Sequence, residues 1–266
     1  MEIFQYAFMR RAFIVGIILA IIIPCIGVTV VLKRLSMMGD ALSHSSLAGV
    51  TIGLLLGINP VLGAMISCIV AAFGIEIIRK KIPQHAEIAI AIIMSTGIGI
   101  AGVLSGFVKN TANFNSFLFG SIVAISDFEL YLVIGIGLIV LLAFILLYKE
   151  LFFMSFNEKG AELAGVPVGL VNSIFTILIA ITVAIAARTV GSLIVSAMMV
   201  VPVACAMQWA KSYRQTVVFS ALFGVCFMIV GLCLAYYVGL KPGGTIVLTG
   251  VAFFMISIMI KKFYRR

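Results

Sequence analysis

The sequence predicts an all-α polytopic membrane protein with about nine transmembrane helices, within a range of eight to ten. Two observations support this fold class. The chain is 64% hydrophobic and only 10% charged, whereas a soluble domain carries about 25% charged residues. Charge-free runs of spanning length, about 20 residues, recur along the whole chain. A soluble core is therefore excluded, and residues 1–266 are interpreted as one transmembrane domain.

Eight apolar runs define the spans in chain order. They cover residues 12–32, 41–75, 88–108, 130–148, 163–187, 189–210, 215–240 and 242–260. The second run is long enough for two helices. Its natural break is Gly57-Ile58-Asn59-Pro60, because Asn and Pro mark a turn and Pro60 can begin the next helix. Residues 114–126 are too short to cross easily and are interpreted as a re-entrant element or half-helix.

The net charge of +9 is interpreted through the membrane topology and not as a sign of nucleic-acid binding. Basic residues mark the cytoplasmic loops of multi-span proteins. With nine spans, one orientation places most of the 18 lysines and arginines inside, with the N-terminus outside and the C-terminus inside. Arg10 and Arg11 fit this orientation poorly, so an even span count with an inner N-terminus stays open.

Three glycines recur at four-residue spacing in the second span, namely Gly49, Gly53 and Gly57. Such a row lets another helix approach closely. We expect it to serve packing within the bundle; a dedicated dimer face is the alternative.

Asp40 and His44 are polar residues inside an apolar span. A carboxylate near the centre of a bilayer costs roughly 2.5–3.5 kcal/mol on insertion, so it usually has a partner or a function. Positions i and i+4 share one face of a helix, and the two side chains should project together. A carboxylate and a neutral imidazole can then approach one divalent cation, with other helices or water completing the coordination.

Two other interpretations of this pair stay open: a hydrogen bond that only locks helices together, and a proton relay. If the pair binds a metal, its oxygen and nitrogen ligands suit zinc, manganese or ferrous iron. The absence of a thiolate cluster argues against cuprous copper. All five cysteines fall within spans without a C-x-x-C pair and are interpreted as packing residues. No permanently bound cofactor is expected.

Pro202 lies inside an apolar run. A proline removes one helical hydrogen bond, here the bond to the carbonyl of Met198, which must find another partner or face a wet cavity. Bends of this kind often line transport paths. Ser196, Met198 and Pro202 are therefore candidate pathway-lining residues, and a kink satisfied by neighbouring helices is the alternative.

The stretch SFNEKGAELAGVP, residues 155–167, interrupts the apolar pattern on the predicted inner side. Ser155 and Glu158 fit an S-x-x-E capping box, and Gly165 followed by Pro167 would end a short helix. We interpret this segment as a coupling helix that docks on a cytoplasmic partner; an ordinary loop with a helical turn is the alternative. Its candidate contact residues are Glu158, Lys159, Ala161, Leu163 and Gly165.

The sequence carries no recognisable catalytic or energy-converting motif. The phosphate loop G-x-x-x-x-G-K-[ST], the zinc motif H-E-x-x-H and a nucleophile elbow are all missing. The chain is therefore not expected to be an enzyme, and ATP hydrolysis would belong to a separate subunit. A self-sufficient proton-coupled carrier stays open as the alternative.

The sequence resembles the membrane permease subunits of bacterial ABC importers for zinc and manganese. The resemblance covers nearly the whole chain and rests on segments in the order typical of that family. They are LKRLSMMGDALSHSSLAGVTIGLLLGINP, SFLFGSIVAIS, NEKGAELAGV, VGSLIVSAMMVVPVACA and LKPGGTIVL.

This resemblance implies a homodimer in the bacterial cell membrane that works with cytoplasmic ATPase subunits and an extracytoplasmic metal-binding protein. It places Asp40 and His44 at the translocation site, and residues 156–165 against the ATPase. The segment DALSHSSLAGV resembles the zinc-importing branch of the family more than the manganese branch, so zinc import by alternating access is expected. The alternative is manganese or ferrous iron.

Overall fold

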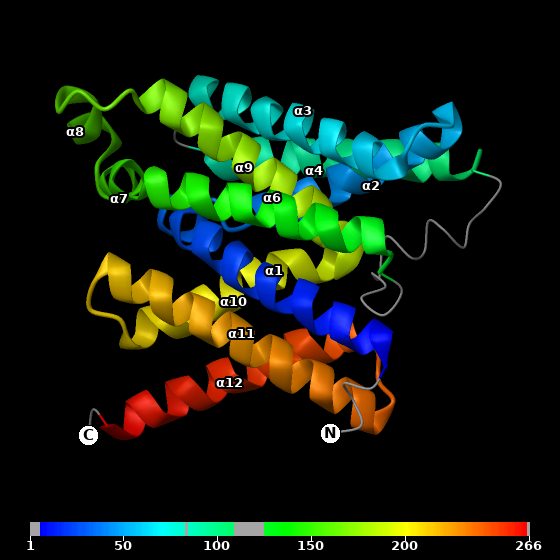
Figure 1. The fold of residues 1–266 in the computed structure, drawn as a ribbon. Helices are drawn as coiled ribbons and strands as arrows, with labels where there is room; N and C mark the ends of the chain where they lie inside the picture. Colours follow the sequence, from blue (N-terminus) through cyan, green and yellow to red (C-terminus); the bar gives the residue numbers. More distant parts are fainter. Residues whose placement is uncertain (1–5, 83–84, 109–124, 265–266) are drawn as a thin grey trace.

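The structure is a computed structural model that describes residues 6–82, 85–108 and 125–264. This part of the chain is entirely helical, which confirms the predicted fold class (Figure 1). The helices are α1 (Ala7–Leu32), α2 (Met38–Leu56), α3 (Pro60–Lys81), α4 (Ala86–Ser105), α6 (Asp127–Leu146), α7 (Tyr148–Phe156), α8 (Glu158–Leu163), α9 (Val168–Thr189), α10 (Ser192–Trp209), α11 (Tyr213–Val238) and α12 (Pro242–Tyr264).

Within the described residues, 7 helices are long and apolar enough to cross a membrane: α1, α3, α4, α6, α9, α11 and α12. The predicted count of about nine is therefore not matched. Helices also form at the other two predicted spans: α2 is not among these seven, and the described apolar stretch of α10, Ile194–Trp209, is shorter than they are. The predicted re-entrant element lies outside the described residues, except for its last two positions.

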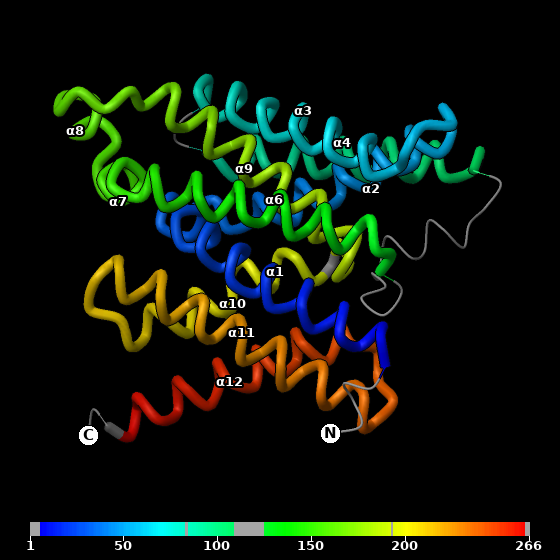
Figure 2. Tube along the Cα trace, viewed as in Figure 1, coloured from blue at the N-terminus to red at the C-terminus, as the bar shows by residue number. Residues whose placement is uncertain are grey.

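The long helices run side by side, with α1 in the middle of the bundle (Figures 1 and 2). The short helices α7 and α8 lie at one end, which we call the α8 end, and the chain's C-terminus lies at the same end. The N-terminus lies at the opposite end. Termini at opposite ends agree with an odd number of crossings, whereas the orientation expected from the basic residues, with the C-terminus inside, stays a prediction.

The predicted break between the second and third spans is confirmed. Gly57 closes α2 in the left-handed region, with φ of +69°, a conformation that glycine adopts without steric cost. The Asn59 side chain accepts a hydrogen bond from the backbone N–H of Val61, and Pro60 begins α3. The two helices therefore form a tight antiparallel pair.

Gly49 and Gly53 of the glycine row pack within the bundle, as predicted, whereas Gly57 is exposed and a Cβ there would meet nothing within 4 Å. A Cβ added at Gly49 would overlap the carbonyl of Gly63 on α3, and it would lie only 2.5 Å from the Cβ of Ser67. A Cβ at Gly53 would lie 3.1 Å from the Cα of Pro60. The backbones of α2 and α3 thus approach each other as closely as two helices can.

Charged pairs tie three helices together at the end opposite α8. Arg11 of α1 pairs with Asp127 at the start of α6, at 2.7 Å. Glu129 of α6 pairs with Arg188 of α9, at 2.8 Å, and also completes a capping box with Ser126. These contacts fix the start of α6 against both neighbours.

Candidate metal site

Contacts between α2 and α3 set the depth at which Asp40 lies. The Ser67 hydroxyl donates a hydrogen bond to the carbonyl of Ser45 (2.8 Å), and the Cys68 thiol donates to the carbonyl of Leu42 (3.3 Å). Because α2 and α3 are antiparallel, the first turn of α2 lies level with the middle of α3. Asp40 therefore lies level with the middle of α3, away from either end of the bundle.

Asp40 and His44 do project from one face, as their spacing predicts. Asp40 Oδ1 lies 3.9 Å from His44 Nε2, too far for a hydrogen bond. The side chains are 27% and 22% exposed, respectively, so both are accessible. One ion bound about 2.1 Å from each ligand can bridge atoms up to about 4.2 Å apart. The geometry thus fits a cation shared by Asp40 and His44 better than a direct hydrogen bond between the two side chains.

Asp40 has no lysine or arginine partner among the described residues. It lies in the first turn of α2, where the helix dipole favours a negative charge. That dipole offsets only part of the cost of a carboxylate at this depth. A cation beside Asp40 would supply the missing opposite charge.

Three neighbouring helices hold α2 in place around the pair. On the α4 side, a Cβ at Gly97 would lie 2.9 Å from the backbone nitrogen of Ser45. On the α10 side, a Cβ at Gly39 would lie 3.2 Å from the sulfur of Met199 and 3.5 Å from the Cα of Ser196. Together with α3, these contacts fix the backbone that carries Asp40 and His44.

Ser43, one turn along α2 from Asp40, is a residue that the sequence analysis did not consider. Its side chain is buried, and its hydroxyl has no hydrogen-bond partner among the described residues. It lies three positions after Asp40, on the adjoining part of the same helical face. A buried, unpaired hydroxyl usually has a role or a bound water. A serine among apolar and glycine neighbours offers no sequence pattern that would have singled it out.

The three pathway-lining candidates lie on α10, which packs against α2. Ser196 is half-buried and adjoins Gly39, whereas Met198 and Pro202 are buried. Helix α10 continues through Pro202 from Ser192 to Trp209. Ser196 is thus placed next to the first turn of α2, while the role of all three residues as pathway lining stays a prediction.

The described residues contain no group of three or more His, Cys, Asp and Glu side chains that could hold a metal ion. If Asp40 and His44 bind a metal ion, they supply two ligands, and water, backbone oxygens or another chain would have to complete the coordination. A site with few protein ligands suits an ion that must leave again, because a closed shell of four protein ligands is typical of structural sites.

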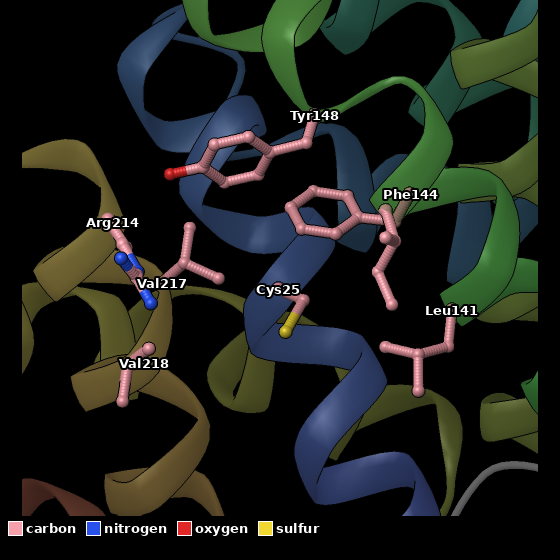
Figure 3. A pocket seen from close by; sticks show the side chains of 8 residues that line it. Cys25, Leu141, Phe144, Tyr148, Arg214, Val217 and Val218 are labelled. Atoms are coloured by element: carbon pink, nitrogen blue, oxygen red, sulfur yellow. The ribbon is translucent and has the colours of Figure 1, made fainter.

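A separate hollow of about 410 Å³ lies between α1, α6, α7 and α11 (Figure 3). Its lining is apolar apart from Tyr148 and Arg214, and Cys25 of α1 lies between the side chains of α6 and those of α11. It contains neither Asp40 nor His44. The guanidinium of Arg214 would repel a metal cation, so this hollow is not a candidate for the metal site.

The predicted coupling segment forms a short helix, but its start differs from the prediction. The Ser155 hydroxyl donates to the carbonyl of Leu151 within α7, at 2.6 Å. Asn157 caps α8 instead, because its side chain accepts a hydrogen bond from the N–H of Gly160. The capping box of Ser155 and Glu158 is therefore wrong. Two cap-type residues stand two positions apart, and the pattern alone does not choose between them.

Gly165 ends α8 as predicted, in the left-handed region with φ of +86°. Its N–H donates to the carbonyl of Glu162, and the N–H of Val166 donates to the carbonyl of Ala161. This pair of bonds is the Schellman motif, a common helix end. The segment is therefore a short helix with a defined stop between α7 and α9, and its coupling role stays a prediction.

The α7–α8 segment presents apolar side chains at its surface. Ala161 is fully buried, whereas Lys159 is exposed and Leu163 is 91% exposed. Phe152, Phe153 and Phe156 of α7 are also exposed. Exposed apolar groups at a bundle end that also carries charged residues indicate a protein contact. The sequence analysis had singled out Leu163 but neither Phe152 nor Phe153.

The chain matches the ABC 3 transport family over residues 5–261. It is 34% identical over 260 residues to a "probable metal transport system membrane protein" of Treponema pallidum (strain Nichols), with 97% of each chain covered. It is 32% identical to the manganese import system permease protein ScaB of Streptococcus parasanguinis, covering 98% of this chain and 94% of that one. A solved structure of PsaBC from Streptococcus pneumoniae in complex with Fab superposes with a TM-score of 0.86 at 30% identity, covering 96% and 92%.

Proposed function

Because this chain belongs to the ABC 3 transport family and is the membrane permease of a metal ABC importer, we propose that Asp40 and His44 bind the ion in transit and that this ion is manganese. The observation that carries the proposal is the placement of this pair: a carboxylate level with the middle of α3, accessible, one helical turn from an imidazole, and without a cationic partner among the described residues.

The proposal of manganese differs from the zinc that was expected from the sequence DALSHSSLAGV. Two similar proteins with a named substrate, from Streptococcus parasanguinis and Listeria monocytogenes, are called manganese systems. The ligand chemistry agrees with this choice. The carboxylate of Asp40, with waters completing the coordination, suits manganese, and the pair supplies a single imidazole, whereas zinc favours sites richer in imidazole and thiolate. Zinc is the competing cargo in the test below.

The partners proposed for this permease are a second copy of itself, cytoplasmic ATPase subunits and an extracytoplasmic metal-binding protein. The sequence contains no phosphate loop, so another chain would hydrolyse the ATP. The exposed surface of α7 and α8 supplies a docking site for that chain. This assignment puts the α8 end and the C-terminus in the cytoplasm of the bacterial cell.

Uptake of Mn²⁺ and Zn²⁺ into proteoliposomes that contain the assembled permease and ATPase tests the proposal. Asp40→Asn and His44→Ala should each lower Mn²⁺ uptake at least about tenfold, since even outer-shell partners of a metal are worth 10–100-fold. The control pair is His85→Ala and Glu87→Gln. These residues also lie close together, at 3.5 Å, but on the surface with 56% and 73% of their side chains exposed, and uptake should not change.

Each proposal fails under a different outcome. Normal uptake by both Asp40→Asn and His44→Ala would remove the site. Saturable uptake of Zn²⁺ that excess Mn²⁺ does not inhibit would replace manganese by zinc. Uptake driven by a proton gradient without ATP would favour a proton-coupled carrier instead.

A further inference from the structure

Three polar side chains from three separate elements form one hydrogen-bonded chain near the α8 end. The ammonium of Lys33, just after α1, donates to Asn172 Oδ1 at 2.7 Å. Asn172 of α9 donates through Nδ2 to Glu158 Oε1 of α8, also at 2.7 Å. Asn172 is only 6% exposed. A buried amide that joins a cation to a carboxylate is a costly arrangement unless all its bonds are made.

Lys33 stands at the joint between α1 and the helix that carries the metal site. The N–H of Arg34 donates to the carbonyl of Val31, and the N–H of Leu35 donates to the carbonyl of Val30. These two bonds form a Schellman motif, with Arg34 in the left-handed region at φ +60°. The buried Leu35 then accepts a hydrogen bond from the N–H of Met38, the first residue of α2.

This joint is short and hydrogen-bonded, so it transmits displacement. Only six residues separate Lys33 from Asp40 in the sequence, and most of them take part in the turn or in the first turn of α2. A shift of the Lys33 backbone therefore moves the start of α2. A flexible linker would absorb the same shift.

The hydrogen-bonded series of side chains ends at Glu158 on α8. Glu158 is the first residue of that helix, between the Asn157 cap and the Gly165 stop. Its carboxylate is half-buried and faces α9 through Asn172, while Lys159 and Leu163 face outward. A protein that pushes on the outer face of α8 thus acts on a helix already bonded to α9.

The charge state of Lys33 depends on the charged groups around it. Burial lowers the pKa of Lys33, and the charge of Arg79 lowers it further, whereas Glu158 and Glu76 raise it. Arg79 itself is paired with Glu76 on α3, at 2.8 Å. Lys33 therefore makes its hydrogen bond to Asn172 at a place where its charge is poorly hydrated, and charge-assisted bonds of this kind are stronger than neutral ones.

We propose that Asn172 is a positioning residue which, through Lys33 and Glu158, transmits movement of α8 to the start of α2 and so to Asp40 and His44. This proposal rests on the proposed function, in which an ATPase docks on α8. An anchor that only stabilises the fold is the competing explanation. The two differ in what they predict for the amount of metal moved per ATP hydrolysed.

The amide of Asn172 makes a charge-swap experiment possible. An Asn side chain carries one acceptor and one donor group, and a half-turn of the amide exchanges them. Lys33→Glu alone and Glu158→Lys alone each place two like charges around Asn172. The double variant Lys33→Glu/Glu158→Lys restores one charge of each sign, with the amide turned around.

The assay uses the complete complex of permease, ATPase and binding protein in vesicles of phosphatidylethanolamine and phosphatidylglycerol. It measures Mn²⁺ uptake and ATP hydrolysis together. Each single variant should lower the uptake per ATP at least about fivefold, and the double variant should recover to within about twofold of wild type. Ser173→Ala, the neighbouring position whose hydroxyl bonds only within α9, is the control and should not change the ratio.

A second pair of variants keeps the test decisive if a charge reversal prevents assembly. Glu158→Gln retains an acceptor oxygen and should keep the ratio within about twofold, whereas Glu158→Ala should lower it. A wild-type ratio in Glu158→Ala, or in both charge reversals, overturns the proposal. If the wild-type complex itself shows no ATP-driven uptake of Mn²⁺ or Zn²⁺, the proposed function has failed instead.

Discussion

Adding one methyl group at Gly49 should destabilise the protein, because no space exists for it between α2 and α3. The new Cβ would lie 2.5 Å from the Cβ of Ser67 and 2.8 Å from the carbonyl carbon of Gly63. Carbon atoms normally approach no closer than about 3.5 Å. All of these atoms are fixed by the backbone, so no rotamer change relieves the overlap. The two helices must separate by about 1 Å.

Overpacking of this kind typically costs 1–3 kcal/mol, and we expect Gly49→Ala to fall in that range. The matched control is Gly99→Ala on α4, where a Cβ would meet nothing within 4 Å. There the change should be neutral or stabilising by about 0.5–1 kcal/mol, because Ala is the better helix former. The two variants add the same methyl group to a helix interior, and their predicted effects have opposite signs.

Equilibrium unfolding of the purified permease in mixed micelles measures both variants. The same samples give the affinity for Mn²⁺, which should fall in Gly49→Ala because the displaced helix carries Asp40 and His44. If Gly49→Ala is as stable as Gly99→Ala, the close approach of α2 and α3 is not what holds the site in place.

Two further predictions concern the α8 end. Ala161→Pro removes the hydrogen bond from the Ala161 N–H to the carbonyl of Asn157 and forces a ring into a fully buried position, at a cost of about 3 kcal/mol. Mn²⁺ binding should persist while the uptake per ATP falls. The control is Ala161→Ser, which keeps the N–H. Uptake per ATP at the wild-type level in Ala161→Pro would show that α8 is not the coupling element. Arg34→Gly should raise the free energy of unfolding by up to about 1 kcal/mol, because glycine adopts the left-handed conformation without strain; a loss of stability in the unfolding assay would mean that the arginine side chain stabilises the joint.

Much of the fold could be predicted because the signals are local. Apolar runs located the helices, and the break at Gly57 to Pro60 and the stop at Gly165 followed from the backbone conformations that Gly and Pro favour. The start of α8 could not be predicted with the same rules. Ser155 and Asn157 are both good cap residues, and the choice depends on whether α7 continues through Ser155, which only its packing decides.

The polar chain of Lys33, Asn172 and Glu158 had no sequence signal at all. Its members are 139 and 14 residues apart in sequence, and an asparagine near the start of an apolar helix is an ordinary feature. What makes Asn172 unusual is its burial between a cation and a carboxylate, and that property exists only once α1, α8 and α9 are packed together.

The depth of Asp40 shows the same limit at the candidate site. Sequence spacing correctly put Asp40 and His44 on one face, because the period of a helix is fixed. It did not fix where the helix begins along the membrane normal, which depends on the antiparallel register of Ser45 and Leu42 with Ser67 and Cys68. Both residues lie in α2, a predicted span that is not among the seven helices long and apolar enough to cross a membrane. A predicted span whose hydropathy is lowered by polar side chains is therefore the first place to look for residues that could bind a transported ion.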